Sequence, residues 1–188
     1  MTEERLISFD TDELIRSAAG SGQVEGLAIP SAAFSASHSP FAAVTRTEGE
    51  GGTPVRFFFT VSVPEDPDDG LADQLWSNAV LNAATLVLER ELAEEAEEEG
   101  LVLSEMKGPG IGGIPIGLTT GIVEITGAER IGVSVNGEGT MYPPFTRCGF
   151  FTALGPGDEA DEVSCGGCRG CAGSGQGCAL CIRRQKMI

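Results

Sequence analysis

Histidine and lysine are scarce in this chain of 188 residues, in which His38 is the only histidine and the lysines are Lys107 and Lys186. His38 lies in a stretch rich in serine and alanine. We therefore expect it to be an exposed loop side chain rather than a catalytic base. With no second histidine, no Ser/His/Asp or Cys/His triad can be argued from the sequence.

Long apolar segments are also missing. No run approaches the ~18 to 20 residues that a membrane-spanning helix needs. The first residues, Met1 to Arg5, are acidic, and no apolar stretch of signal-peptide length follows them. We therefore expect a cytoplasmic protein that does not enter the membrane. Cysteines stay reduced in that compartment, so clustered thiols there act as ligands or redox groups rather than forming disulfides.

Positive charge is the third shortage. Twelve Lys and Arg residues stand against 28 Asp and Glu residues, which gives a net charge of −16 and a pI near 4.3. Binding to nucleic acid phosphates needs a basic surface, so we exclude nucleic acid as the main partner. The acidity is best explained as a means of keeping the protein solvated.

The length and pattern of the chain predict one domain with a small appendage. Residues 1–154 form the domain in this interpretation, and residues 155–188 form an acidic linker followed by a cysteine-rich tail. Two helices are predicted, over residues 10–19 and about 71–99. The longer one ends in a glutamate run that we expect to be solvated. Its apolar face contains Leu75, Ala79, Ala83 and Val87, together with the pair Leu75/Trp76 spaced to Val80.

Several β-branched or aromatic runs predict strands. The one at residues 55–63 is expected to be central, with Trp76 and the phenylalanines Phe57, Phe58 and Phe59 in the core. Further strands are predicted at residues 101–103, 130–135, 140–142 and about 147–153, and Cys148 is expected to be a buried core thiol. Residues 20–53 are expected to be irregular with short strands, and residues 114–126 fit either a helix or a strand.

Five of the six cysteines fall near the C-terminus with the spacing of metal ligands: Cys165, Cys168, Cys171, Cys178 and Cys181. Two CxxC pairs bring thiolates close enough to chelate one ion, and the glycines between them allow tight wrapping. The segment that begins at Cys168 also resembles the CxxCxGxG zinc repeat of DnaJ-type chaperones. We therefore predict a metal centre in the tail.

The identity of the metal stays open at this point. Zinc would take four thiolates in tetrahedral geometry, for which Cys168, Cys171, Cys178 and Cys181 are the candidates. The CxxCxxC run is equally typical of the opening of a ferredoxin-type iron–sulfur site, although the fourth cysteine comes later than in ferredoxins. An unmetallated redox tail is a third interpretation.

Four motifs in order carry a family resemblance over residues 55–154. They are a long helix that begins around Leu75, the turn Gly108-Pro109-Gly110-Ile111-Gly112-Gly113, the segment Ala128-Glu129-Arg130-Ile131-Gly132-Val133, and Met141-Tyr142-Pro143. Their order and spacing resemble the activation domain of cobalamin-dependent methionine synthase. The resemblance is closer to the stand-alone proteins that carry this domain, many of which also end in a few cysteines.

The resemblance implies an α+β fold with a twisted antiparallel sheet flanked by helices, here with a small metal-binding tail. It also implies a groove that binds S-adenosylmethionine and presents it to an oxidised corrinoid. Its candidate ligand-binding residues are Lys107, Gly108, Pro109, Gly110, Gly112, Glu138 and Met141. The family usually has an arginine and a tyrosine where this chain has Met106 and Ile111. Lys107 could supply the positive charge, although a lysine replaces a bidentate arginine poorly.

Two classes of function follow. In the first, the protein is an accessory protein that docks on a corrinoid protein, or on a corrinoid-dependent methyltransferase, and assists its reductive reactivation, with S-adenosylmethionine as the candidate methyl donor. In the second, it is a non-catalytic module that binds zinc or an iron–sulfur cluster and serves in interaction or electron transfer. The glycine turn can equally be a plain connection between two elements.

Overall fold

The computed structural model describes residues 2–48, 54–66, 68–111 and 114–155. Within them, five antiparallel strands form one sheet in the spatial order β1-β2-β3-β7-β4. The strands are β1 (Thr2–Ser8), β2 (Phe41–Thr47), β3 (Val55–Ser62), β4 (Val102–Leu103) and β7 (Thr146–Leu154). A short hairpin of β5 (Ser134–Val135) and β6 (Met141–Tyr142) lies outside the sheet.

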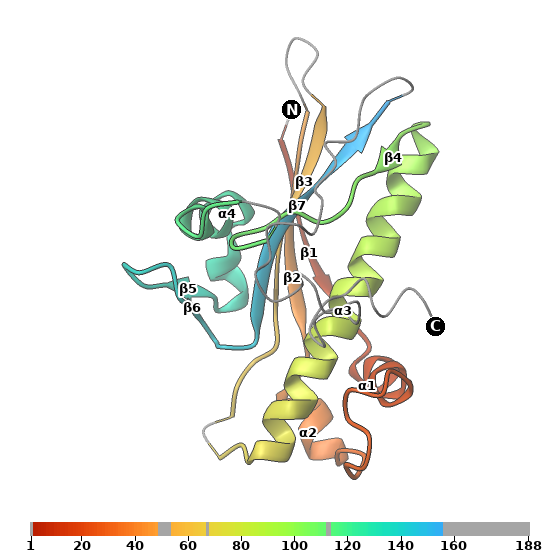
Figure 1. Cartoon of the computed structure of the whole chain (residues 1–188), viewed down its shortest axis with the longest axis vertical. Helices are drawn as coiled ribbons and strands as arrows, with labels where there is room; N and C mark the ends of the chain where they lie inside the picture. Colours follow the sequence, from red (N-terminus) through yellow and green to blue (C-terminus); the bar gives the residue numbers. More distant parts are fainter. Residues whose placement is uncertain (1, 49–53, 67, 112–113, 156–188) are drawn as a thin grey trace, which may run out of the picture.

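Helices cover both faces of this twisted sheet (Figure 1). One side carries α1 (Thr11–Gly20), α2 (Ala32–Ser37) and the long helix α3 (Leu71–Glu98). The other side carries α4 (Leu118–Thr126), the 3₁₀ turn η1 (Ala128–Ile131) and the β5–β6 hairpin. The expected α+β class, with an antiparallel sheet flanked by helices, is confirmed. In the described ranges no helix has both the length and the apolarity to cross a membrane.

Strand β3 is central, as its aromatic run predicted. Its side chains alternate between the two faces of the sheet. Phe57 and Phe59 are fully buried in the core on the α3 side. Phe58 packs on the opposite side, where the hydroxyl of Thr60 bonds that of Thr126 in α4 at 2.9 Å. The sheet therefore separates two cores, the larger of which faces α3.

The first half of α3 is buried against the sheet and α1. The side chain of Trp76 is buried, and its indole Nε1 donates a hydrogen bond to the Ala28 carbonyl at 3.0 Å. This bond gives the buried indole N–H an acceptor, which a buried tryptophan usually needs. Ala79 and Ala83 are also buried as predicted, whereas Leu75 is 43% exposed. Trp76 and Val80 of the predicted face are buried too, so Leu75 lies at the exposed margin of that face.

One expectation about the fold needs correction, and three further segments are now defined. Residues 130–135 are not one strand, because Gly127 and Gly132 adopt left-handed backbone conformations and bound the 3₁₀ turn η1. Residues 20–53 contain α2 and the seven-residue strand β2, which pairs along its whole length with β1. We had predicted no element for the residues that form β1. The ambiguous segment 114–126 contains the helix α4.

The glutamate run at the end of α3 is only partly a solvated face. Most of its side chains are exposed, but Glu95 and Glu99 reach back to the sheet. Both guanidinium Nη atoms of Arg46 in β2 bond the Glu99 carboxylate at 2.6 Å, and Arg5 in β1 pairs with Glu95. The hydrogen bonds from Arg46 lower the pKa of Glu99. These carboxylates therefore link α3 to the sheet, a structural role.

Cys148 is buried on the α4 side of β7, as predicted. Burial raises its pKa from 9.0 to about 11, because the thiolate would lose its hydration. We expect iodoacetamide at neutral pH to leave Cys148 unmodified in the native protein and to modify it after denaturation, as judged by peptide mass mapping. Equal labelling in both states would contradict this burial.

The same shift has a consequence for stability. The folded state holds the Cys148 proton more tightly than the unfolded state, so stability should fall as the pH rises from about 9 to about 11. A Cys148→Ala variant should lack this part of the decline.

Candidate functional site

The predicted glycine turn lies at the outer edge of β7. Lys107 and Phe150 exchange two backbone hydrogen bonds, of 2.9 and 2.7 Å, and so attach the turn to the sheet. The chain then reverses through Pro109 and Gly110, and the Ile111 amide donates to the Gly108 carbonyl at 2.8 Å. Proline followed by a glycine with φ of +77° is typical of a type II turn.

Two glycines of this segment have structural reasons for their identity. Gly110 needs its positive φ, which side chains disfavour. Gly108 passes so close to β7 that an added Cβ would lie 2.8 Å from the Cys148 carbonyl oxygen. The turn is therefore required by the fold as a connection, whether or not it also contacts a ligand. Gly112, the remaining glycine of the predicted set, lies outside the described residues.

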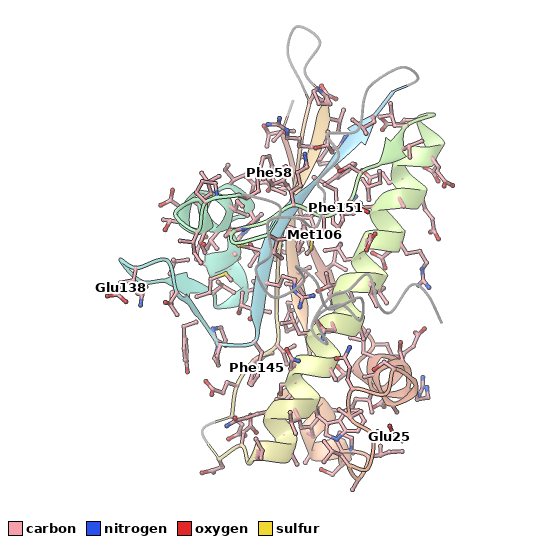
Figure 2. All side chains as sticks on the ribbon, in the orientation of Figure 1. Glu25, Phe58, Met106, Glu138, Phe145 and Phe151 are labelled. Carbon is pink, nitrogen blue, oxygen red and sulfur yellow. The ribbon has the colours of Figure 1, made fainter. Side chains whose placement is uncertain are left out.

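Glu138 and Met141 belong to a different element, the β5–β6 hairpin. The exposed Glu138 occupies the turn, where its amide donates to the Asn136 side chain at 3.0 Å. Figure 2 shows it at the outer end of the hairpin, with Met106 over the sheet. Met141 is half-buried and packs into the core on the α4 side. Glu138 is thus set apart from the turn with which it was predicted to share a ligand.

A polar cluster that we had not predicted lies on the α3 side of β7. Arg147 donates from one Nη to Asn82 Oδ1 at 2.6 Å and from the other to Thr85 Oγ1 at 3.4 Å. Asn82 in turn donates to Gln23 Oε1 at 2.8 Å. Asn82 and Thr85 are buried, and Arg147 and Gln23 are half-buried. Desolvation lowers the pKa of Arg147, although the guanidinium remains charged.

The sequence contained a signal for this cluster. In the strand that we predicted at residues 147–153, every second residue faces the same side, which groups Arg147 with Phe151 and Ala153. Both of these apolar side chains are buried against α3. An arginine on the core face of a strand needs polar partners, and the alternation alone would have identified Arg147 as unusual.

His38 is not the exposed loop residue that we expected, because its side chain is only 2% exposed. Its ring stacks on Phe34 at a centroid distance of 4.0 Å. Its Nε2 lies 2.8 Å from a carboxylate oxygen of the buried Asp69. The prediction failed because Asp69 comes from the loop before α3, which the local composition around His38 does not reveal.

Ser37 completes a Ser–His–Asp set of contacts, since its Oγ lies 2.8 Å from His38 Nδ1. The same Oγ donates to the Ala33 carbonyl at 3.0 Å, and Nδ1 lies 3.1 Å from the Phe34 carbonyl. Catalysis would require the hydroxyl proton to point at the imidazole. The Ser37 hydroxyl has two backbone carbonyl acceptors besides the ring, those of Ala33 and Phe34, and the imidazole is buried. The cluster therefore works as a clasp between α2 and the loop before α3.

The predicted metal ligands Cys165, Cys168, Cys171, Cys178 and Cys181 lie outside the described residues. Within the described ranges, no group of three or more His, Cys, Asp or Glu side chains is placed to hold a metal ion. The prediction of a metal centre thus still depends on the cysteine spacing.

The exposed turn and the half-buried Lys107 lie at the edge of β7, where Lys107 pairs with Phe150 and so shares the α4 face, whereas Arg147 is held on the α3 face. Of the two cations, Arg147 is the one held in a fixed orientation, and a carboxylate suits its planar guanidinium fork. Neither a scan against models of known protein families nor a search among curated proteins finds a match to the chain.

Proposed function

We propose that this protein is an accessory protein that assists the reductive reactivation of a corrinoid protein, with S-adenosylmethionine as the methyl donor. The motif order over residues 55–154 is the basis of the proposal, and the α+β fold with a central antiparallel sheet is compatible with it. Arg147 adds a cationic group on the α3 face of β7, suited to the amino-acid carboxylate of the methyl donor.

The reaction has two balanced steps. An external one-electron reductant converts cob(II)alamin to cob(I)alamin, and this nucleophile takes the sulfonium methyl group to give methylcob(III)alamin and S-adenosylhomocysteine. In the proposal, the protein binds the methyl donor and docks on the corrinoid partner, so that both reactants are held together.

A spectroscopic experiment tests this function. The probe is the corrinoid-binding fragment of methionine synthase loaded with cob(II)alamin, mixed anaerobically with an electron donor and S-adenosylmethionine. We expect the cob(II)alamin spectrum to convert to that of methylcob(III)alamin faster when this protein is present. Rates that are identical with and without it, together with no S-adenosylmethionine binding, would reject the proposal.

The second candidate is a metal-binding interaction or electron-transfer module, favoured by the two CxxC pairs near the C-terminus. After anaerobic purification we expect bound iron with an iron–sulfur absorption spectrum, or bound zinc in a colourless protein. Joint replacement of Cys168, Cys171, Cys178 and Cys181 by serine should remove the metal. Cys148→Ala, which changes the one cysteine outside the cluster, should retain it. Absence of both metals from the wild-type protein would refute this candidate.

A further inference from the structure

Two arginines of the sheet have no ion pair among the described residues: Arg56, which is exposed and lies over the Phe150 ring, and Arg147, which is half-buried. Arg5, Arg46 and Arg130 each form an ion pair with a glutamate. The hydrogen-bond partners of Arg147 in the described part of the chain are an amide oxygen and a hydroxyl oxygen, both neutral. Its positive charge is therefore uncompensated there.

An uncompensated charge in a half-buried position is costly, because the lost hydration is not replaced by a counter-ion. The chain carries 28 acidic residues, so carboxylates are abundant. Those in the described ranges that form ion pairs do so with other partners. An apolar residue would fill this position in β7 without the desolvation cost. A cation at this position thus points to an anion that it binds.

The guanidinium of Arg147 is also held in a fixed orientation. Asn82 accepts one of its hydrogen bonds and is itself positioned by Gln23. The Thr85 hydroxyl donates to the Leu81 carbonyl at 2.8 Å and so turns its lone pairs toward the arginine. These contacts engage two of the five N–H donors of an arginine. Donors remain for a bidentate contact with a carboxylate.

Arg147 lies toward the end of β7 that β4 does not pair with. Strand β4 pairs with Ala153 and Leu154, at the far end of β7. Phe150 turns its N–H and C=O toward the outer edge, where they bond Lys107. Because these groups alternate along a strand, Cys148 and Thr146 turn theirs toward the same edge. The Gly108 backbone lies against the Cys148 carbonyl, so the next outward-facing groups toward the start of β7 are those of Thr146.

We propose that Arg147, positioned by Asn82 and Thr85, anchors the carboxylate of a small organic ligand. Under the proposed function, on which this identification of the ligand rests, the carboxylate is that of the methionine part of S-adenosylmethionine. The site then supplies, from β7, the bidentate contact that Met106 cannot make.

Calorimetric titration of the full chain tests the anchor. S-adenosylmethionine should bind wild-type protein, with affinity reduced about tenfold by Arg147→Lys and about a hundredfold by Arg147→Met, the size expected for lost charged hydrogen bonds. 5′-Methylthioadenosine lacks the amino-acid carboxylate, so its affinity should be the same in all three proteins. Arg56→Met, which removes an exposed arginine from β3, is the matched control and should leave both affinities unchanged. Equal losses for both ligands would overturn the carboxylate assignment.

A second readout separates this proposal from the proposed function. Methionine or succinate is added to the protein, and the NMR chemical shift of the Arg147 Nε–H group is followed. The signal is assigned by its absence from the spectrum of the Arg147→Lys variant. A response to these carboxylates without S-adenosylmethionine binding would support the anchor and count against the methyl donor.

A carboxylate of the chain itself would compete for Arg147, and the sequence after β7 contains Asp158, Glu159, Asp161 and Glu162. The same titration is therefore repeated with the variant Asp158→Asn/Glu159→Gln/Asp161→Asn/Glu162→Gln. A response that appears only in this variant would assign the anchored carboxylate to that segment. No response in either protein would overturn the proposal.

Discussion

Gly149→Ala should destabilise the protein by about 3 kcal/mol, the upper range for overpacking a core. Gly149 lies in β7 where the chain that leads into the glycine turn crosses the sheet edge. An added Cβ would lie 2.5 Å from the Lys107 carbonyl oxygen and 3.2 Å from the Phe59 ring. Neither can move easily, because the first is backbone held by Phe150 and the second is a fully buried aromatic side chain.

Denaturant unfolding of wild-type and variant protein measures this loss. Gly121→Ala is the matched control, because Gly121 lies in α4 and an added Cβ there meets nothing within 4 Å. That substitution should stabilise by roughly 0.5–1 kcal/mol through helix propensity. A Gly149→Ala protein as stable as wild type would show that the turn does not pack against β7 as described. If it folds, its ligand affinity would also report whether the turn contributes to binding.

His38→Ala and Asp69→Ala should each cost roughly 3 kcal/mol, because each leaves the other member of a buried pair without its partner. The side chains are 2% and 8% exposed, and their contact of 2.8 Å joins residues 31 positions apart. His38→Ala additionally removes the ring that stacks on Phe34. We expect the loss to appear as a lower midpoint of thermal or denaturant unfolding.

A double-mutant cycle isolates the pair itself. The double variant should be less destabilised than the sum of the single variants by about 1–3 kcal/mol, since removal of both partners leaves no group unpaired. Asp66→Asn is the control, because it replaces a different carboxylate of the same loop. It should change the free energy of unfolding by much less. Strict additivity of the two single variants would mean that His38 and Asp69 are not coupled in solution.

The His38–Asp69 clasp and the proposed anion site at Arg147 differ in the hydrogen-bonding groups that they leave available to a ligand. In the clasp, His38 and Ser37 have their ring and hydroxyl atoms engaged by Asp69 and by backbone carbonyls. At β7, Arg147 is engaged by neutral oxygens and keeps its charge uncompensated among the described residues. The first arrangement contributes to stability, whereas the second is suited to binding. We therefore expect variants of His38 to affect folding and variants of Arg147 to affect ligand affinity.

Local patterns in the chain were sufficient to predict α1, β3, α3 and most of β7. These elements depend on periodicity and end signals within a short window, such as Asp10, whose side chain accepts from the Glu13 amide at the start of α1. The burial of Trp76 and Cys148 followed from the same patterns. The expected cysteine centre also follows from spacing alone, and it stays a prediction.

The remaining features depend on contacts between distant parts of the chain. Arg147 meets Asn82 across 65 positions of sequence, and the conformation of neither segment reveals the other. The register of β1 on β2, the burial of His38 and the close approach at Gly149 likewise arise only when the elements pack. Propensity and spacing describe how each segment folds by itself. Tertiary packing decides which polar groups face one another, because only packing determines which residues share a buried surface.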